Sequence, residues 1–369
     1  MIPGLDGLRA LAFLTVLTGH TGNYRFGWIG VQLFFVLSGF LITGILVRMK
    51  ASLGRRDFFL RFYGRRFLRI FPLYYFYLSL LFGIAILLPF LHFKPFYKEF
   101  GEKFWSQIWF AVCYVYDFFH ASANYEPSRF FTHLWSLSVE EQFYVLWPLI
   151  IFITPVRRLK RMSLVAIGVG PLLRLLIDIF YHYRPFPFLL DNPPAAVYVL
   201  PFSQIDAFAI GAYISQFEIP RPRLQFILLL VLVPLLGFSA QYLATGSIML
   251  NTLGYEFPLQ TAYKEIWGYS LLNYFFAVMI YGVARTRMFG FLLENVLMRW
   301  LGKISYGLYV YHGAVTWFIL KLDLPVDLGT WQMYLLSLAL TTAVASLSFY
   351  LLEKPINDLK EKYFPIPAS

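Results

Sequence analysis

The chain has 369 residues, of which 59% are hydrophobic and only 14% are charged. Soluble domains average roughly 45–50% apolar and about 25% charged residues, so this composition excludes an ordinary soluble protein and predicts an integral membrane protein. The net charge of +11 comes largely from short basic loops between apolar runs, which is more typical of membrane topology than of nucleic-acid binding. The single Cys113 excludes an intrachain disulfide and a Cys-cluster metal site.

Ten apolar runs, each close to the roughly 20 residues that cross a bilayer, predict ten transmembrane helices. A shorter aromatic run at 104–119 predicts an extra helix that is re-entrant or interfacial, or else an eleventh span. Five basic loops follow apolar runs, at residues 48–69, 157–161, 221–223, 285–303 and 354–362. With ten spans all five loops lie on one side of the membrane together with both termini. An eleventh span would place the first loop on the side opposite to the other four. We therefore expect an all-α bundle with both termini in the cytoplasm. The expected spans are 5–23, 28–47, 72–90, 133–154, 162–182, 197–217, 224–243, 265–284, 300–320 and 331–352.

The first apolar run, LDGLRALAFLTVLTGH, carries Arg9 and His20. Eleven residues make about three helical turns, so the two side chains share one face and are separated by about 16 Å along the axis. Ionisable groups inside a membrane span cost roughly 2.5–3.5 kcal/mol each and by default indicate a functional site facing the bundle interior. The alternative is that Asp6 and Arg9 only pair near the membrane surface, while His20 bonds to a neighbouring helix.

Residues 53–71 mix arginine with phenylalanine at helical spacing. One interpretation is an amphipathic helix on the anionic inner leaflet. The other is that some of these arginines bind a phosphorylated ligand from the cytoplasm, because a guanidinium group binds phosphate through a bidentate fork. The pattern alone leaves both open. The candidate ligands are Arg61, Arg65, Arg66 and Arg69.

The fourth run begins HLWSLSVEEQFYVLWP, in which His133, Ser136 and Glu140 fall on one helical face. A carboxylate in such a position can hold a histidine tautomer, stabilise an imidazolium or act as a base. The alternative is that Glu140 caps the helix or pairs with a neighbouring arginine.

Two later runs also carry polar groups. Asp206 is a lone acid in the sixth run, for which a structural hydrogen bond is the favoured interpretation, and the small residues Ala209, Gly211 and Ala212 allow close helix approach. The ninth run places His312 in a second polar stripe, with Ser305 and Thr316.

The sequence contains no Gly-rich phosphate loop, no His-Glu-x-x-His and no Gly-x-Ser-x-Gly, which argues against an ATPase, a zinc protease and an ordinary serine hydrolase.

Four patches together resemble the membrane-bound acyltransferase 3 family, which includes the glycan O-acetyltransferases. They are LDGLRALAFLTVLTGH continuing into GVQLFFVLSGFLIT, then YGRRFLRIFPLYY, HLWSLSVEEQFYVLWP, and ISYGLYVYH with the terminal YLLEKP. The patches occur in the family's order and cover nearly the whole chain. We therefore expect 1–369 to form a single membrane-embedded domain without an appended soluble domain.

The resemblance implies an acyl-CoA donor, an acceptor hydroxyl that is often on a cell-surface sugar, and the inner membrane of a bacterium. It also implies that activity depends on Arg9, His20, the arginine cluster and Glu140. Many relatives carry arginine two residues before the acid that matches Asp206. This chain has Gln204 there, which weakens a donor-binding role at that position. Some relatives add a C-terminal esterase-like domain, so we expect this chain to act alone or with a separate partner.

We hypothesise transfer of an acyl group, most simply acetyl from acetyl-CoA, to a hydroxyl of a cell-surface glycan or lipid-linked sugar, without a metal. The arginine cluster binds the donor's phosphates, with Arg9 deeper along the path. His20 removes the hydroxyl proton, and Glu140 orients His20 or stabilises its charge. All these groups are expected to converge on one tunnel from the cytoplasmic side. The expected acceptor-binding residues are His312, Ser305, Trp135 and Asp206.

Three alternatives remain open at this level. His20 can instead carry the acyl group as a transient intermediate. The chain can also be a proton-coupled transporter or a lipid or glycan flippase, in which buried histidine and glutamate form a proton relay. A non-catalytic scaffold for glycan assembly is the third. The expected partners are the donor, the acceptor and membrane lipids, and we expect no nucleic acid.

Overall fold

The computed structural model describes residues 2–22, 24–87, 90, 100–183, 193–257, 259, 262–321 and 329–366. Within these ranges every regular element is a helix and no strand occurs, which confirms the expected all-α class. The longer helices are α1 (Pro3–His20), α2 (Ile29–Ser52), α3 (Arg55–Leu87), α7 (Leu134–Ile153), α8 (Leu159–Tyr183), α10 (Ile205–Gln216), α11 (Pro222–Thr245), α12 (Lys264–Thr286), α15 (Ser305–Lys321) and α16 (Thr330–Ser348). The shorter helices are α5 (Glu102–Val112), α6 (Tyr116–His120), α9 (Pro193–Val199), α13 (Gly290–Leu293), α14 (Val296–Lys303) and α17 (Lys354–Tyr363). Single turns of 3₁₀-helix cover Val156–Arg158, Pro201–Gln204 and Leu250–Thr252, and a π-helical turn covers Phe349–Glu353.

Seven helical segments in the described part of the chain are long and apolar enough to cross a membrane. They contain α2, α3, α7, α8, α11, α12 and α16, and they make the chain an integral membrane protein. The expected count of about ten is not confirmed. The helices at three other expected spans, α1, α10 and α15, have 18, 12 and 17 residues. A helix of 12 residues is about 18 Å long and falls short of the roughly 30 Å hydrocarbon core, and α1 carries Asp6 and Arg9.

Helix α3 is continuous over Arg55–Leu87. The arginine-rich stretch 53–71 and the expected third span therefore form one element, with Pro72 inside it; residues 88–89, at the expected end of that span, lie outside the described residues. The extra short element expected at 104–119 is present as α5 and α6. The 11 residues of α5 cover about 16 Å, which is too short for an eleventh span.

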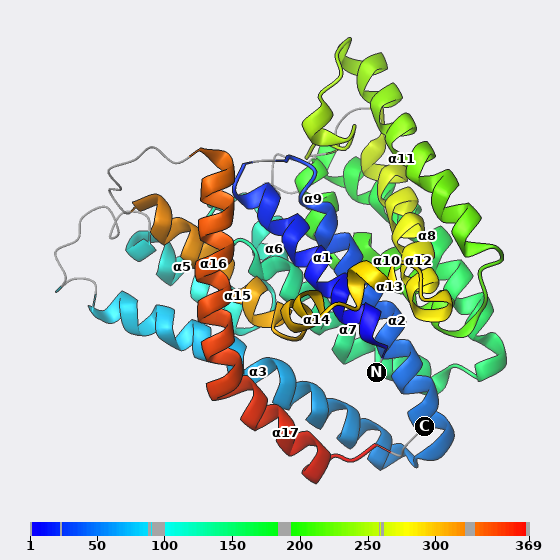
Figure 1. The fold of residues 1–369 in the computed structure, drawn as a ribbon, viewed down its shortest axis with the longest axis horizontal. Coiled ribbons are helices and arrows are strands. Elements are labelled where there is room, and N and C mark those ends of the chain that lie inside the picture. Colours follow the sequence, from blue (N-terminus) through cyan, green and yellow to red (C-terminus); the bar gives the residue numbers. More distant parts are fainter. Residues whose placement is uncertain are drawn as a thin grey trace.

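Helices α1 and α2 lie in the centre of the bundle (Figure 1). Helix α2 packs against α1, α7, α10 and α12, while α1 also packs against α14 and α15. The hairpin of α11 and α12 lies with α8 on one side of this centre, and α3, α16 and α17 lie on the other (Figure 1). Both termini lie at the same end of the bundle, which we call the terminal face.

The crossing of α2 and α10 depends on two glycines. A Cβ atom on Gly39 would lie 2.1 Å from the carbonyl oxygen of Phe208, and one on Gly211 would lie 2.1 Å from that of Val36. Such distances are possible only for glycine, so the two backbones are in direct contact. The expectation that small residues in the sixth run allow close helix approach is confirmed.

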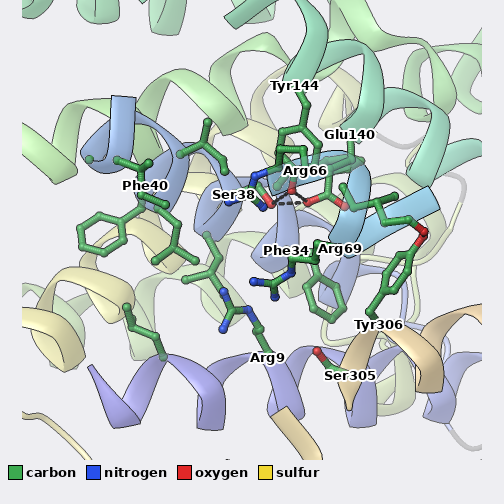
Figure 2. A pocket seen from close by; sticks show the side chains of 18 of the residues that line it. Arg9, Phe34, Ser38, Phe40, Arg66, Arg69, Glu140, Tyr144, Ser305 and Tyr306 are labelled. Atoms are coloured by element: carbon green, nitrogen blue, oxygen red, sulfur yellow. Dashed lines mark hydrogen bonds between the residues drawn. The ribbon is translucent and has the colours of Figure 1, made fainter. Parts of the chain in front are cut away.

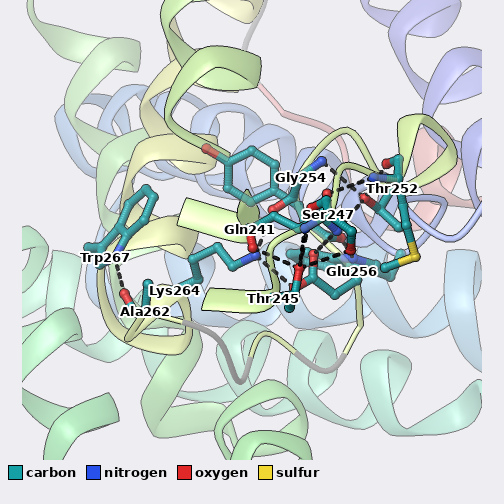
Figure 3. A network of polar contacts seen from close by, with 12 residues as sticks. Gln241, Thr245, Ser247, Thr252, Gly254, Glu256, Ala262, Lys264 and Trp267 are labelled. Atoms are coloured by element: carbon teal, nitrogen blue, oxygen red, sulfur yellow. Dashed lines mark hydrogen bonds and ion pairs between the residues drawn. The ribbon is translucent and has the colours of Figure 1, made fainter. Parts of the chain in front are cut away.

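A buried polar network closes the far end of the α11–α12 hairpin (Figure 3). The ammonium group of Lys264 is fully buried and donates to Glu256 Oε1 at 2.8 Å and to the Gly254 carbonyl at 2.7 Å. The amide of Gln241 donates to the other oxygen of Glu256 at 3.0 Å. Because a buried charge is tolerated only when it is paired and hydrogen-bonded, these contacts hold Gly254 and Glu256 against α11 and α12.

Candidate functional site

A cavity of about 600 Å³ opens among α1, α2, α3, α7 and α15, and we call it the arginine cavity. Arg9, Arg66 and Arg69 point into it from α1 and α3 (Figure 2). Arg48 at the end of α2 and Arg285 at the end of α12 also line it. The lining carboxylates are Glu140 and Glu141. Five guanidinium groups against two carboxylates make this cavity suited to an anionic ligand.

Arg66 and Arg69 are three residues apart on α3, so both reach the same side of the helix. The guanidinium of Arg66 lies over the ring of Tyr144, 5.3 Å from its centroid. Among the residues that the structure describes, Arg66 and Arg69 form no ion pair with a carboxylate. Arg9, in contrast, pairs with Asp6 at 2.6 Å. The two α3 guanidinium groups therefore keep donors for a ligand.

Arg61 and Arg65 hold the end of the chain instead. Arg61 donates to the Pro365 carbonyl at 2.7 Å, and Arg65 donates to Glu361 Oε1 at 2.7 Å. The expectation that all four arginines face one ligand is therefore wrong. At about 100° per residue the four side chains spread over about 140° of the helix surface, so one part of this arc faces the C-terminal segment and the other part faces the cavity.

Glu140 lies in the arginine cavity. Its Oε1 accepts hydrogen bonds from the hydroxyl groups of Ser38 and Tyr144 (Figure 2). Tyr144 comes from the next turn of the same helix, and Ser38 comes from α2. The structure does not bring Glu140 to His20, since the two side chains line different cavities. The expected contact between them is wrong, because hydrogen-bond donors from α2 and α7 already hold the carboxylate.

The second cavity, of about 470 Å³, contains His20 at the far end of α1, and we call it the histidine cavity. His120 and His133 also line it, together with the guanidinium-bearing side chain of Arg25. Much of its remaining wall is aromatic. Trp135, which the sequence analysis names as an acceptor-binding residue, is among the lining residues. The other aromatic lining residues are Trp28, Tyr125, Tyr198, Phe257 and Tyr309.

Three histidine rings form a chain beside this cavity. The ring centroid of His312 is 4.7 Å from that of His20 and 5.0 Å from that of His133. His312 Nδ1 lies 2.6 Å from the Tyr309 carbonyl oxygen, and His133 Nε2 lies 3.0 Å from that of Val310. A carbonyl only accepts, so both of these nitrogens carry hydrogen in the bonded state. His312 Nε2 has no partner within the described part of the chain, and its lone pair is available in the neutral ring.

Val31 and Tyr309 line both cavities and form the partition between them. The Tyr309 hydroxyl lies 2.5 Å from Ser136 Oγ, which ties α15 to α7 at this point. The expectation of one common tunnel is therefore wrong, because the structure places Arg9 and Glu140 in one cavity and His20 in another. Helix α1 nevertheless connects the two halves, with Arg9 in the arginine cavity and His20 in the histidine cavity.

Three of the predicted substrate-binding residues do not line the histidine cavity. Ser305 lines the arginine cavity and not the histidine cavity, where an acceptor-binding residue was expected. His312 lines neither cavity directly but contacts His20. Asp206 lines neither, because its carboxylate is bonded in a bidentate pair to Arg174 of α8, with both N–O distances 2.8 Å. The substrate-binding prediction for Asp206 is contradicted, and the structural hydrogen bond is confirmed.

The acyltransferase domain family matches residues 2–350 of this sequence. The chain belongs to this family. The chain is 29% identical over 368 residues to the putative peptidoglycan O-acetyltransferase YrhL of Bacillus subtilis. This alignment covers 96% of the chain and 55% of the relative. It is 28% identical over 375 residues to the O-acetyltransferase OatA of Staphylococcus aureus, with 98% and 58% covered. It is 27% identical to the peptidoglycan O-acetyltransferase OatA of Listeria monocytogenes, with 96% and 56% covered.

The chain thus spans a little more than half the length of these curated relatives. No solved structure matches it. Among the residues of its family-like patches, Arg9 and Glu140 line the arginine cavity and His20 lines the histidine cavity.

Other residues of the two cavities were not predicted from the sequence. Tyr144 follows Glu140 by one helical turn, so its contact could have been inferred from periodicity. Ser38 and Tyr309 meet their partners across different helices, and no local pattern indicates those contacts. Arg48 and Arg285 belong to basic segments whose charge was interpreted only as a signal for topology.

Replacing Arg174 with lysine is expected to lower the free energy of unfolding of the protein by roughly 1–3 kcal/mol. Arg174 is fully buried and also donates to Ser270 and to the Ser203 carbonyl, so a single ammonium group leaves acceptors without donors. The measurement is thermal unfolding of the purified protein in one detergent. Arg157→Lys, an exposed position, is the matched control, and equal melting temperatures for the two variants would contradict the assignment.

Proposed function

We propose that this protein is a membrane O-acyltransferase that transfers an acetyl group from cytoplasmic acetyl-CoA to a hydroxyl group of peptidoglycan. The observation that carries the proposal is the arrangement of α1, which presents Arg9 to a cationic cavity and His20 to an aromatic one. Family membership supports acyl transfer. The names of two relatives include peptidoglycan as the substrate.

The arginine cavity is the proposed donor site. Coenzyme A carries several phosphate charges, and the five guanidinium groups give it complementary charge and hydrogen-bond donors. In this proposal the terminal face lies in the cytoplasm, where acyl-CoA is found. Glu140, held by two hydroxyl groups, limits the excess positive charge beside Arg66.

The proposed reaction joins the acceptor oxygen to the acetyl carbon. The hydroxyl oxygen attacks the thioester carbonyl carbon, and His20 takes the hydroxyl proton. The carbon–sulfur bond then breaks, and the thiolate takes the proton from the imidazolium. The products are an acetyl ester and the free thiol of coenzyme A. His312 supports His20 by ring contact, with a ring-centroid distance of 4.7 Å.

The thioester has to pass the partition to reach His20. In direct transfer Val31 and Tyr309 move apart, so that the thioester and the acceptor meet beside the histidine ring. In the second route the His20 nitrogen attacks the thioester first and releases the thiolate, and the acceptor oxygen then takes the acetyl group from the histidine. Single-turnover mixing with labelled acetyl-CoA and no acceptor separates the routes, because only the second one labels the protein.

The experiment that tests the function uses purified protein in lipid nanodiscs, radiolabelled acetyl-CoA and isolated peptidoglycan. The expected result is alkali-labile label on the glycan together with an equal amount of free coenzyme A thiol. Nanodiscs without protein provide the control. Proton or glycan movement across proteoliposomes, without thiol release, would instead support the transporter class.

A further inference from the structure

The described lining of the histidine cavity contains basic side chains and no acidic ones. Its lining includes three histidines and Arg25. No aspartate or glutamate lines it among the residues that the structure describes. The carboxylate expected there, Glu140, lies across the partition in the arginine cavity. A histidine that accepts a proton in this cavity therefore has no described carboxylate to stabilise the imidazolium.

A lack of counter-charge matters most in a partly dehydrated site. An imidazolium formed during catalysis is normally stabilised by a carboxylate bonded to the ring. Here the two other rings of the histidine chain direct N–H groups at the carbonyls of Tyr309 and Val310. They provide no negative charge. The charge that completes the site has to come from a group that binds there.

One arginine lies where it can bind such a group. Arg25 is exposed and lines the cavity, and its backbone N–H donates to the Asn251 carbonyl at 3.0 Å, which fixes this part of the α1–α2 connection. Within the described ranges Arg25 forms no ion pair with a carboxylate.

The aromatic wall favours a sugar as the rest of the ligand. The ring centroids of Trp135 and Tyr198 lie 4.5 Å apart and those of Trp28 and Tyr198 lie 5.6 Å apart, so the three rings form one contiguous aromatic cluster. Aromatic rings provide large, rigid contact areas for the apolar faces of a ligand, while a few polar groups set its orientation.

We propose, on the basis of the acyl-transfer function above, that the acceptor is an acidic sugar whose anionic group binds Arg25 beside the reacting hydroxyl. The sugar rings then lie against Trp28 and Trp135. The bound anion supplies the counter-charge that the cavity lining lacks, so the substrate itself completes the charge balance of the histidine. A carboxylate and a phosphate share this chemistry.

The test compares three matched acceptors: a disaccharide of N-acetylglucosamine and N-acetylmuramic acid, its neutral methyl amide, and that amide with an anomeric phosphate. Binding to the full-length protein in nanodiscs is measured by calorimetry, and kcat/KM for acetyl transfer is measured separately. We expect at least one anionic acceptor to exceed the neutral amide by about tenfold in both measurements. The anion that does so identifies the source of the charge.

In the Arg25→Gln variant we expect the anionic and the neutral acceptor to bind, and to accept acetyl, almost equally well. The Arg157→Gln variant, which changes an exposed arginine outside both cavities, is expected to keep the preference for the anionic acceptor. Equal binding and transfer of all three acceptors by the wild-type protein would overturn the inference and leave the O-acyl transfer intact. Binding that prefers an anion, with no transfer to any acceptor, would support the anion site and overturn the proposed reaction. Binding and transfer that are both undetectable would overturn both proposals.

Discussion

The His20→Gln variant is expected to transfer acetyl about 10²–10⁴-fold more slowly than the wild-type protein, because a positioned general base contributes a factor of this size. Glutamine keeps the approximate volume and polarity of the side chain, and His20 faces a cavity instead of filling the core. Folding is therefore expected to survive. The measurement is the initial rate of label transfer to peptidoglycan at saturating acetyl-CoA.

The control is His182→Gln, because His182 is an exposed histidine on α8 that lines neither cavity. Its rate is expected to match that of the wild-type protein. The His312→Gln variant adds a second comparison. A smaller loss there than in His20→Gln agrees with a supporting ring, whereas a full loss in His312→Gln with an active His20→Gln would assign the base to His312 and contradict our proposal.

The parts of the fold that the sequence predicted depend on local chemistry. Hydrophobic length located the helices, and the separation of Arg9 and His20 predicted that both would lie on the interior face of one helix. These inferences succeed because helical periodicity links sequence distance directly to position. The helix α3 was less predictable, because Pro72 normally interrupts a helix in water but is accommodated where neighbouring helices satisfy the freed backbone group.

The contacts that the sequence could not reveal join residues far apart in the chain. Arg65 binds Glu361, and Arg174 supplies the cation for Asp206. Charge alone does not select such partners, since every arginine is a candidate for every acid until the helices are placed. The same limit explains why Glu140 was assigned to the wrong histidine environment.

The division into two cavities changes the roles that can be assigned to the charged residues. A single tunnel would place the carboxylates beside the histidines, and the positive charge of the donor site would then oppose protonation of His20. The partition of Val31 and Tyr309 separates these environments. Cations can gather around the proposed donor phosphates, while the histidine cavity receives its negative charge from the acceptor. The correction therefore makes a cationic donor site and a histidine base compatible.

The double variant Arg66→Gln, Arg69→Gln is expected to raise KM for acetyl-CoA by about 10²–10⁴-fold. Each charge-assisted hydrogen bond contributes about 1.5–3 kcal/mol, and about 1.4 kcal/mol corresponds to a factor of ten. Both side chains point into the arginine cavity (Figure 2) and have no described carboxylate partner. The measurement is the dependence of the initial transfer rate on acetyl-CoA concentration, with peptidoglycan in excess.

The matched control is Arg61→Gln, Arg65→Gln, which removes the same charge from the same helix. These side chains bind Asp57, Glu361 and the C-terminal backbone, and partly exposed pairs of this kind contribute only about 0–1 kcal/mol each. KM for acetyl-CoA is therefore expected to change by less than about tenfold. If the two double variants raise KM equally, the effect comes from the general positive field of the terminal face, and the assignment of Arg66 and Arg69 as specific donor ligands is wrong.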